Sequence, residues 1–170
     1  MLKKKGLARL LILVCFISFT GIASPVQAQD QAPAKLQAAL IMKLLAFYTN
    51  LGDKPFTIQV VGAPDIAKEL KALVGKSAGK ATLNDVVEGD APSGSPQVVY
   101  VGKSPGDVIG FTQSNKILSV TGIPAFVNDG VTLGIGIENK KPKIILNLSS
   151  SKAEEINWNP AILKVAATIN

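Results

Sequence analysis

The sequence predicts a single α/β domain with a mixed sheet, mostly parallel, that carries helices on both faces and a C-terminal antiparallel hairpin. Two observations support this prediction. Short apolar runs typical of buried strands alternate with helical segments over the first two-thirds of the chain after residue 28. Residues 132–148, "TLGIGIENKKPKIILNL", follow as two alternating stretches joined by a polar turn.

We expect residues 1–28 to be a cleaved secretory signal peptide. Four basic residues within the first nine precede an apolar run from Leu10 to Phe19. Val26-Gln27-Ala28 then supplies small residues at the two positions that a signal peptidase reads. A membrane-spanning helix needs about 20 apolar residues, and this run is shorter. Cleavage after Ala28 leaves residues 29–170, a length that suits one domain in the periplasm.

The composition of residues 29–170 excludes several kinds of chemistry. The 18 basic residues fall to 14 lysines once the first 28 residues are removed, while all 12 acidic residues remain, so the net charge falls from +6 to +2. This part has no Arg, no His and no Cys. A disulfide, a Cys/His zinc site and a histidine base are therefore excluded, and nothing favours nucleic acid binding.

The elements are expected in the following order. A long, very apolar helix from Pro33 to Leu51 packs in the core or against a partner. Further helices are expected over 63–76 and, more weakly, 104–115, and the strands over 56–62, 81–87, 97–102 and 116–122. Ser151 and Glu154 have capping-box spacing, and Asn159-Pro160 predicts the start of a closing helix that runs to Ile169.

Gly134 and Gly136 raise the question of a dinucleotide-binding loop. Such a loop needs a strand, a tight glycine turn and a helix, in that order. Here the glycines alternate with Leu133, Ile135 and Ile137, and a second alternating stretch follows the turn. The hairpin interpretation is therefore preferred, with both glycines on a face that a neighbouring backbone or helix approaches closely.

Other catalytic signals are weak. The stretch "GKSAGK" at 75–80 ends a helix rather than opening one, and no Gly-x-Ser-x-Gly elbow is present. Glu154 and Glu155 are the only adjacent acids and are expected to be charges near a helix start. No catalytic residue, cofactor, nucleotide or metal ligand is predicted.

Three aromatic residues are the candidate partner-binding residues: Phe47, Tyr48 and Trp158. Packing in the core is the simpler explanation for each of them. The functional alternative is an anchor in a protein interface, where Trp and Tyr are enriched.

Three segments taken in order resemble the YfiR-like periplasmic regulatory proteins. They are "AALIMKLLAFYTNLGDKPFTIQVVG", "KILSVTGIPAFVNDGVTLGIGIENKKPKIILNLSSSKAEEI" and "AILKVA", which together span nearly all of residues 29–170. The chain departs from the better-known regulator in having no Cys after Cys15, so that protein's redox-linked cysteine pairs have no counterpart here. Asn50 to Pro55 and Asn159-Pro160 also depart from the usual pattern, which leaves the partner open.

The resemblance implies a compact periplasmic domain that is not an enzyme. It also implies binding to a membrane-anchored signalling protein, such as the periplasmic part of an inner-membrane diguanylate cyclase, repression of that partner, and a possible homodimer. A small-ligand-binding sensor domain remains the alternative.

Overall fold

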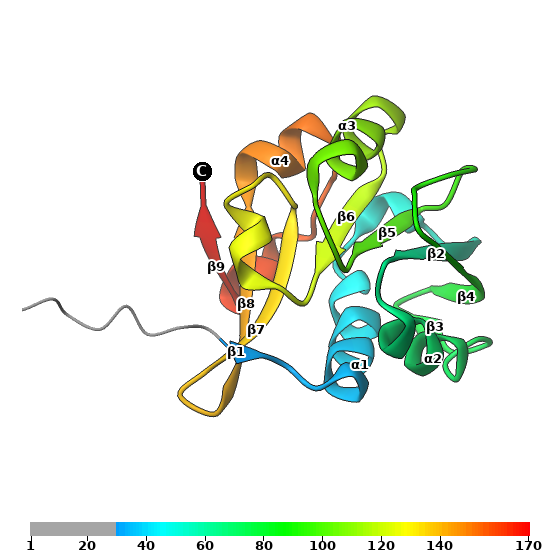
Figure 1. Cartoon of the computed structure of the whole chain (residues 1–170), viewed down its shortest axis with the longest axis horizontal. Helices are drawn as coiled ribbons and strands as arrows, with labels where there is room; N and C mark the ends of the chain where they lie inside the picture. Colours follow the sequence, from blue (N-terminus) through cyan, green and yellow to red (C-terminus); the bar gives the residue numbers. More distant parts are fainter. Residues whose placement is uncertain (1–29) are drawn as a thin grey trace, which may run out of the picture.

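A nine-stranded mixed sheet organises residues 30–170, the part of the chain that this computed structural model describes (Figure 1). Its strands are β1 (Asp30–Gln31), β2 (Pro55–Val61), β3 (Ser77–Ala78), β4 (Ala81–Gly89), β5 (Val98–Val101), β6 (Leu118–Thr121), β7 (Leu133–Glu138), β8 (Lys141–Asn147) and β9 (Ala166–Ile169). The helices are α1 (Ala34–Leu45), α2 (Pro64–Lys71), α3 (Gly106–Asn115) and α4 (Leu148–Ala153), with short 3-10 turns η1 (Thr49–Leu51), η2 (Pro124–Val127) and η3 (Pro160–Lys164). The predicted signal peptide lies outside the described residues.

The strand order is β3-β4-β2-β5-β6-β7-β8-β9, with β1 pairing alongside β7. The five strands from β4 to β7 along this order are parallel, and β8 turns back antiparallel to β7. This arrangement confirms the predicted mixed, mostly parallel sheet with its antiparallel hairpin. A Cβ on Gly134 would overlap the Val127 side chain of η2, so this glycine does lie where a neighbouring element approaches closely.

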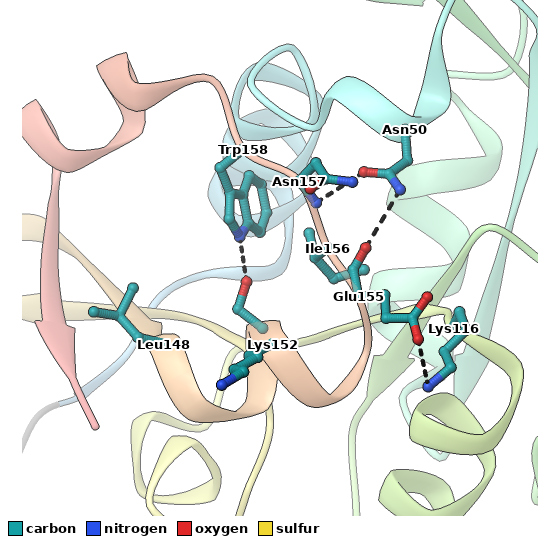
Figure 2. Close-up of a pocket in the computed structure, with 9 residues that line it drawn as sticks. Asn50, Lys116, Leu148, Lys152, Glu155, Ile156, Asn157 and Trp158 are labelled. Carbon is teal, nitrogen blue, oxygen red and sulfur yellow. Dashed lines mark hydrogen bonds and ion pairs between the residues drawn. The ribbon is translucent and has the colours of Figure 1, made fainter.

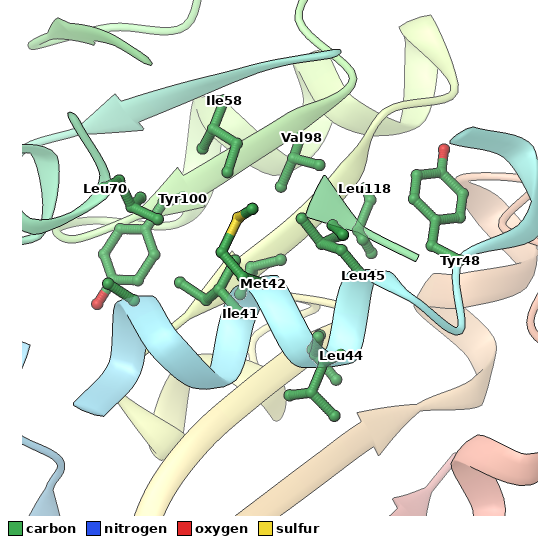
Figure 3. Packing of buried hydrophobic residues seen from close by; sticks show 14 of the residues in the cluster. Ile41, Met42, Leu44, Leu45, Tyr48, Ile58, Leu70, Val98, Tyr100 and Leu118 are labelled. Atoms are coloured by element: carbon green, nitrogen blue, oxygen red, sulfur yellow. The ribbon is translucent and has the colours of Figure 1, made fainter. Parts of the chain in front are cut away.

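The larger core lies between the sheet and α1 with α2, and a smaller core lies under α3 on the other face. Figure 3 shows α1 directing Ile41, Met42 and Leu45 toward strand residues such as Val98 and Leu118. Ile41 and Leu45 are each 1% exposed, so the apolar first helix belongs to the core. None of the helices within residues 30–170 has the length and apolar character needed to cross a bilayer.

The first helix is shorter than predicted. It ends at Leu45 rather than Leu51, and a turn leads into η1. The apolar spacing continues past Leu45, but Tyr48 adopts extended backbone and bridges to Trp158 instead of extending the helix. A tertiary contact therefore overrides the helical pattern.

The predicted closing helix is wrong. Asn159 does cap a turn, since its side chain accepts a hydrogen bond from Ala161 N, but that turn is η3 and ends at Lys164. Residues Ala166–Ile169 then form β9, which pairs in parallel with β8. Pairing with β8 gives hydrogen-bond partners to the backbone N–H and C=O groups along one side of β9. A short helix over the same residues would leave several of its terminal backbone groups without intrahelical partners.

The predicted capping box is also wrong. The residue that caps α4 is Asn147, whose side chain accepts a hydrogen bond from Ser150 N at 2.9 Å. Ser151 lies inside the helix, and Glu154 stands at its C-terminal end, fully buried. Glu154 is thus not a solvated charge at a helix start.

Candidate functional site

Two segments far apart in the sequence join at one end of the sheet. The turn after α1 (residues 47–51) and the segment after α4 (residues 155–159) form a short backbone ladder. Asn159 N donates to Phe47 O at 2.8 Å, and Thr49 N donates to Asn157 O at 2.9 Å. We refer to these two segments together as the clip.

Side chains reinforce the clip. Asn157 N donates to Asn50 Oδ1 at 2.8 Å, and Asn50 Nδ2 donates to Glu155 O at 3.4 Å (Figure 2). Thr49 Oγ1 adds a bond to Asn157 O at 2.8 Å. Because Asn50 offers both a donor and an acceptor, one amide fixes the 155–157 backbone on two sides.

Trp158 projects from the clip toward α4. Its Nε1 donates to Ser151 Oγ at 2.6 Å, and its ring lies 5.8 Å from the Tyr48 ring, tilted by 47°. Tyr48 is 7% exposed, whereas Trp158 and Phe47 are half-buried. The indole is therefore held in one orientation while part of its surface faces solvent.

A surface depression of about 630 Å³ opens beside the indole (Figure 2). It is lined by Asn50, Lys116, Leu148, Ser151, Lys152, Glu155, Ile156, Asn157 and Trp158. Six of these nine residues are exposed. Lys116 pairs with Glu155 at 3.1 Å, so the second lysine, Lys152, leaves the lining with a net positive charge.

Glu154 directly precedes residues 155–159 of the clip and is held in the protein interior by hydrogen bonds. Its Oε2 accepts hydrogen bonds from Ser119 N at 3.0 Å and Thr132 Oγ1 at 2.7 Å, while Oε1 is buried without a hydrogen-bond partner. Burial raises the pKa of Glu154, and the hydrogen bonds from Ser119 and Thr132 oppose that rise. Burial, followed by the nearby Glu154 charge, also raises the pKa of Tyr48 to about 12.

The structure brings all three predicted partner-binding residues together. Phe47 and Tyr48 lie in one strand of the clip and Trp158 in the other. Sequence reasoning missed the polar lining, namely Asn50, Lys116, Ser151, Lys152, Glu155 and Asn157. The available signal was the pair of asparagines that flank Trp158, since Asn is favoured where backbone groups need side-chain partners.

The residues that line the depression suit the binding of another molecule better than the catalysis of a reaction. Its one buried hydroxyl, on Ser151, accepts from the indole, and its acid, Glu155, pairs with Lys116 at the surface. Across residues 30–170 no group of three or more acids, cysteines or histidines is placed to hold a metal ion. An indole edge, amides and the Lys152 ammonium, for which no ion pair is recorded within residues 30–170, together suit the docking of protein side chains.

The model of the YfiR/HmsC-like family matches residues 34–167 of the chain. No curated protein sequence matches the chain.

Several solved structures share the fold. A conserved domain protein from Vibrio cholerae O1 biovar El Tor superposes with a TM-score of 0.53 at 14% identity, covering 83% of this chain and 61% of the other. The ABC domain from Streptococcus pneumoniae, solved in complex with L-Trp, superposes with a TM-score of 0.52 at 16% identity, covering 84% of this chain and 62% of the other. The chain thus spans about three-fifths of each of these proteins and matches them in fold alone.

Proposed function

The chain belongs to the YfiR/HmsC-like family, and we propose that it is a periplasmic regulatory protein that works by binding rather than by catalysis. Its partner is the periplasmic part of an inner-membrane signalling enzyme, such as a diguanylate cyclase, which it represses. Export by residues 1–28 places it in that compartment.

The Trp158 depression is the observation that supports this proposal most directly. Interfaces are enriched in Trp, Tyr and Arg, and their central anchors are held rigidly before binding. Trp158 meets this requirement because Ser151 and Tyr48 fix its ring while part of it remains exposed. Phe47, half-buried in the adjoining strand of the clip, widens the contact, and Tyr48 supports the indole from within.

Repression follows from differential affinity. A membrane cyclase exchanges between an inactive and an active arrangement, and a protein that binds the inactive one more tightly shifts the population toward it. Each 1.4 kcal/mol of difference in binding free energy changes that population ratio by about tenfold. No chemistry by the regulator is required.

The sensor alternative has less support. The Streptococcus pneumoniae neighbour was solved with L-Trp, but ligand sites of that kind enclose about 70–90% of a small molecule. The depression beside Trp158 is bounded mostly by exposed residues and cannot enclose a ligand in this way. A broad, shallow surface with an anchored indole fits a protein partner better.

The test is repression of cyclase activity in the cell. We expect deletion of the gene to raise the intracellular level of cyclic di-GMP, and expression of the full chain with its leader to restore it. Expression of residues 29–170 without a leader, which keeps the domain in the cytoplasm, should not restore it. Unchanged cyclic di-GMP after deletion, or full rescue by the leaderless chain, would contradict the proposal.

A further inference from the structure

Strand β9 forms one edge of the sheet, with its outer side open. It pairs with β8 through the register Ile144 to Ala166 up to Asn147 to Ile169, and no other strand of the described chain follows it in the sheet. Figure 1 shows β9 as the arrow at the C-terminal edge of the sheet, next to β8. The opposite edge strand, β3, has two residues, whereas β9 has four and is continued by the open side of residues 141–143.

Apolar side chains gather around this edge. Of the five large hydrophobic residues exposed in the described chain, three lie here: Leu163 at 56%, Val165 at 52% and Leu148 at 39%. Leu163 and Val165 precede β9, and Leu148 belongs to α4, which packs against it. A surface hollow of about 550 Å³ runs between the start of β8 and β9, with Val165 and Ala167 on its β9 side.

Cations flank the same edge. Lys141 and Lys143 line the hollow, and Lys164 lies just before Val165. The structure records an ion pair for one of them, between Lys143 and Glu138, and none for Lys141 or Lys164 within residues 30–170. The lysines lie beside an apolar edge strand, and charges at such an edge are one way in which sheet proteins discourage self-pairing.

From these observations we infer that the β9 edge docks an extended, acidic segment of a partner protein, which adds a strand to the sheet. The open backbone of β9 selects for an extended chain, because strand addition supplies main-chain hydrogen bonds. Alternate apolar side chains of that segment would cover Val165 and Ala167, and its carboxylates would face Lys141 and Lys164. A second copy is a poorer occupant, because its own edge brings lysines and one acid that is already paired.

The inference names a docking mode for the partner and in that respect rests on the proposed function. Its location differs from that of the Trp158 depression, although Leu148 lies between the two surfaces and lines the first.

The test uses two fluorescent peptides, one of alternating glutamate and valine and one of alternating lysine and valine, added to residues 29–170. We expect the acidic peptide to bind, to bind several-fold more weakly in high salt because surface charges are screened, and to slow amide exchange in residues 166–169. The lysine peptide should not bind. Equal binding of both peptides, absence of binding, or slowed exchange at another site would overturn the inference.

Charge reversal supplies the matched variants. The double variant Lys141→Glu, Lys164→Glu should lose the acidic peptide by about tenfold or more and acquire binding of the lysine peptide. The control, Lys68→Glu with Lys80→Glu, changes the net charge equally at the far end of the sheet and should bind as the wild type does. Sedimentation of the wild type and of Thr168→Lys tests the second copy: self-association that this substitution leaves unchanged is expected to lie elsewhere, and self-association that it abolishes would instead assign β9 to a homodimer.

The membrane enzyme is absent from this test, so the two proposals fail separately. Loss of peptide binding with repression retained would remove the β9 inference alone. Peptide binding without any effect of gene deletion on cyclic di-GMP would leave the edge as a docking strand and remove the cyclase.

Discussion

Replacing Glu154 should change how stability depends on pH, because its carboxylate is buried with one oxygen unpartnered. Burial raises the pKa above the ordinary value of 4.5, so the folded state favours the protonated form. The contribution of Glu154 to the free energy of unfolding is therefore largest below pH 4.5 and declines as the pH rises through the folded-state pKa. One proton sets the limit of this slope at about 1.4 kcal/mol per pH unit.

Two substitutions separate charge from hydrogen bonding. Glu154→Gln keeps an oxygen that accepts from Ser119 N and Thr132 Oγ1, so stability at neutral pH should stay within about 1 kcal/mol of the wild type. Glu154→Ala leaves both buried donors without their acceptor, at about 1–3 kcal/mol each, so a loss of about 2–6 kcal/mol is expected.

The assay is urea unfolding of residues 29–170, which is monitored by circular dichroism and repeated at a series of pH values from about 4 to about 8. The other carboxylates contribute equally to wild type and Glu154→Gln, so the difference between the two isolates Glu154. We expect the wild type to gain stability relative to the glutamine variant as the pH falls. A difference that stays constant with pH would refute the assignment of a buried, titrating carboxyl group.

Further predictions concern packing and capping, and each is checked by urea unfolding. Gly134→Ala should lower the free energy of unfolding by about 1–3 kcal/mol, because its Cβ would overlap Val127 and the strand cannot move aside. Gly110→Ala should raise it by about 0.5–1 kcal/mol, because a Cβ there meets open space within α3. Asn147→Ala should cost about 2 kcal/mol, since it removes the cap on Ser150 N and the buried bond to Val127 O; an unchanged melting temperature would contradict that role.

Local patterns predicted much of this fold. Alternation in residues 132–148 indicated two strands and excluded a dinucleotide loop, and the structure confirms the pairing of Leu133 with Leu146. Continuous apolar runs likewise indicated the buried strands β5 and β6, in which every residue is buried. Such patterns succeed because the period of side-chain burial is a local property of helix or strand.

The errors occur where distant segments decide the local conformation. The stripe of Ile162, Val165 and Ile169 fits a helix by spacing, but a short apolar run cannot be distinguished from a strand until its neighbour, β8, is known. The spacing of Ser151 and Glu154 matched a capping box, but the residue that caps α4 is Asn147. The Glu154 carboxylate instead accepts hydrogen bonds from Ser119 in β6 and from Thr132 just before β7.

The candidate site was predicted in its aromatic residues and missed in its polar ones. Phe47, Tyr48 and Trp158 stood out as residue types that interfaces favour. That Asn50 would bond to the backbone near Trp158 depends on two segments more than 100 residues apart. Nothing in either segment alone specifies the other.

The most direct test of partner binding through the Trp158 depression is the dissociation constant between residues 29–170 and the periplasmic domain of the diguanylate cyclase that we propose as the partner. We expect Trp158→Ala to weaken binding by about 30-fold or more, the loss of a central anchor worth about 2 kcal/mol. The control is Val74→Ala, because Val74 is exposed and lies between α2 and β3, at the edge of the sheet opposite β9. This substitution should leave the dissociation constant unchanged. Trp158→Ala that stays folded and binds as tightly as the wild type would contradict the account.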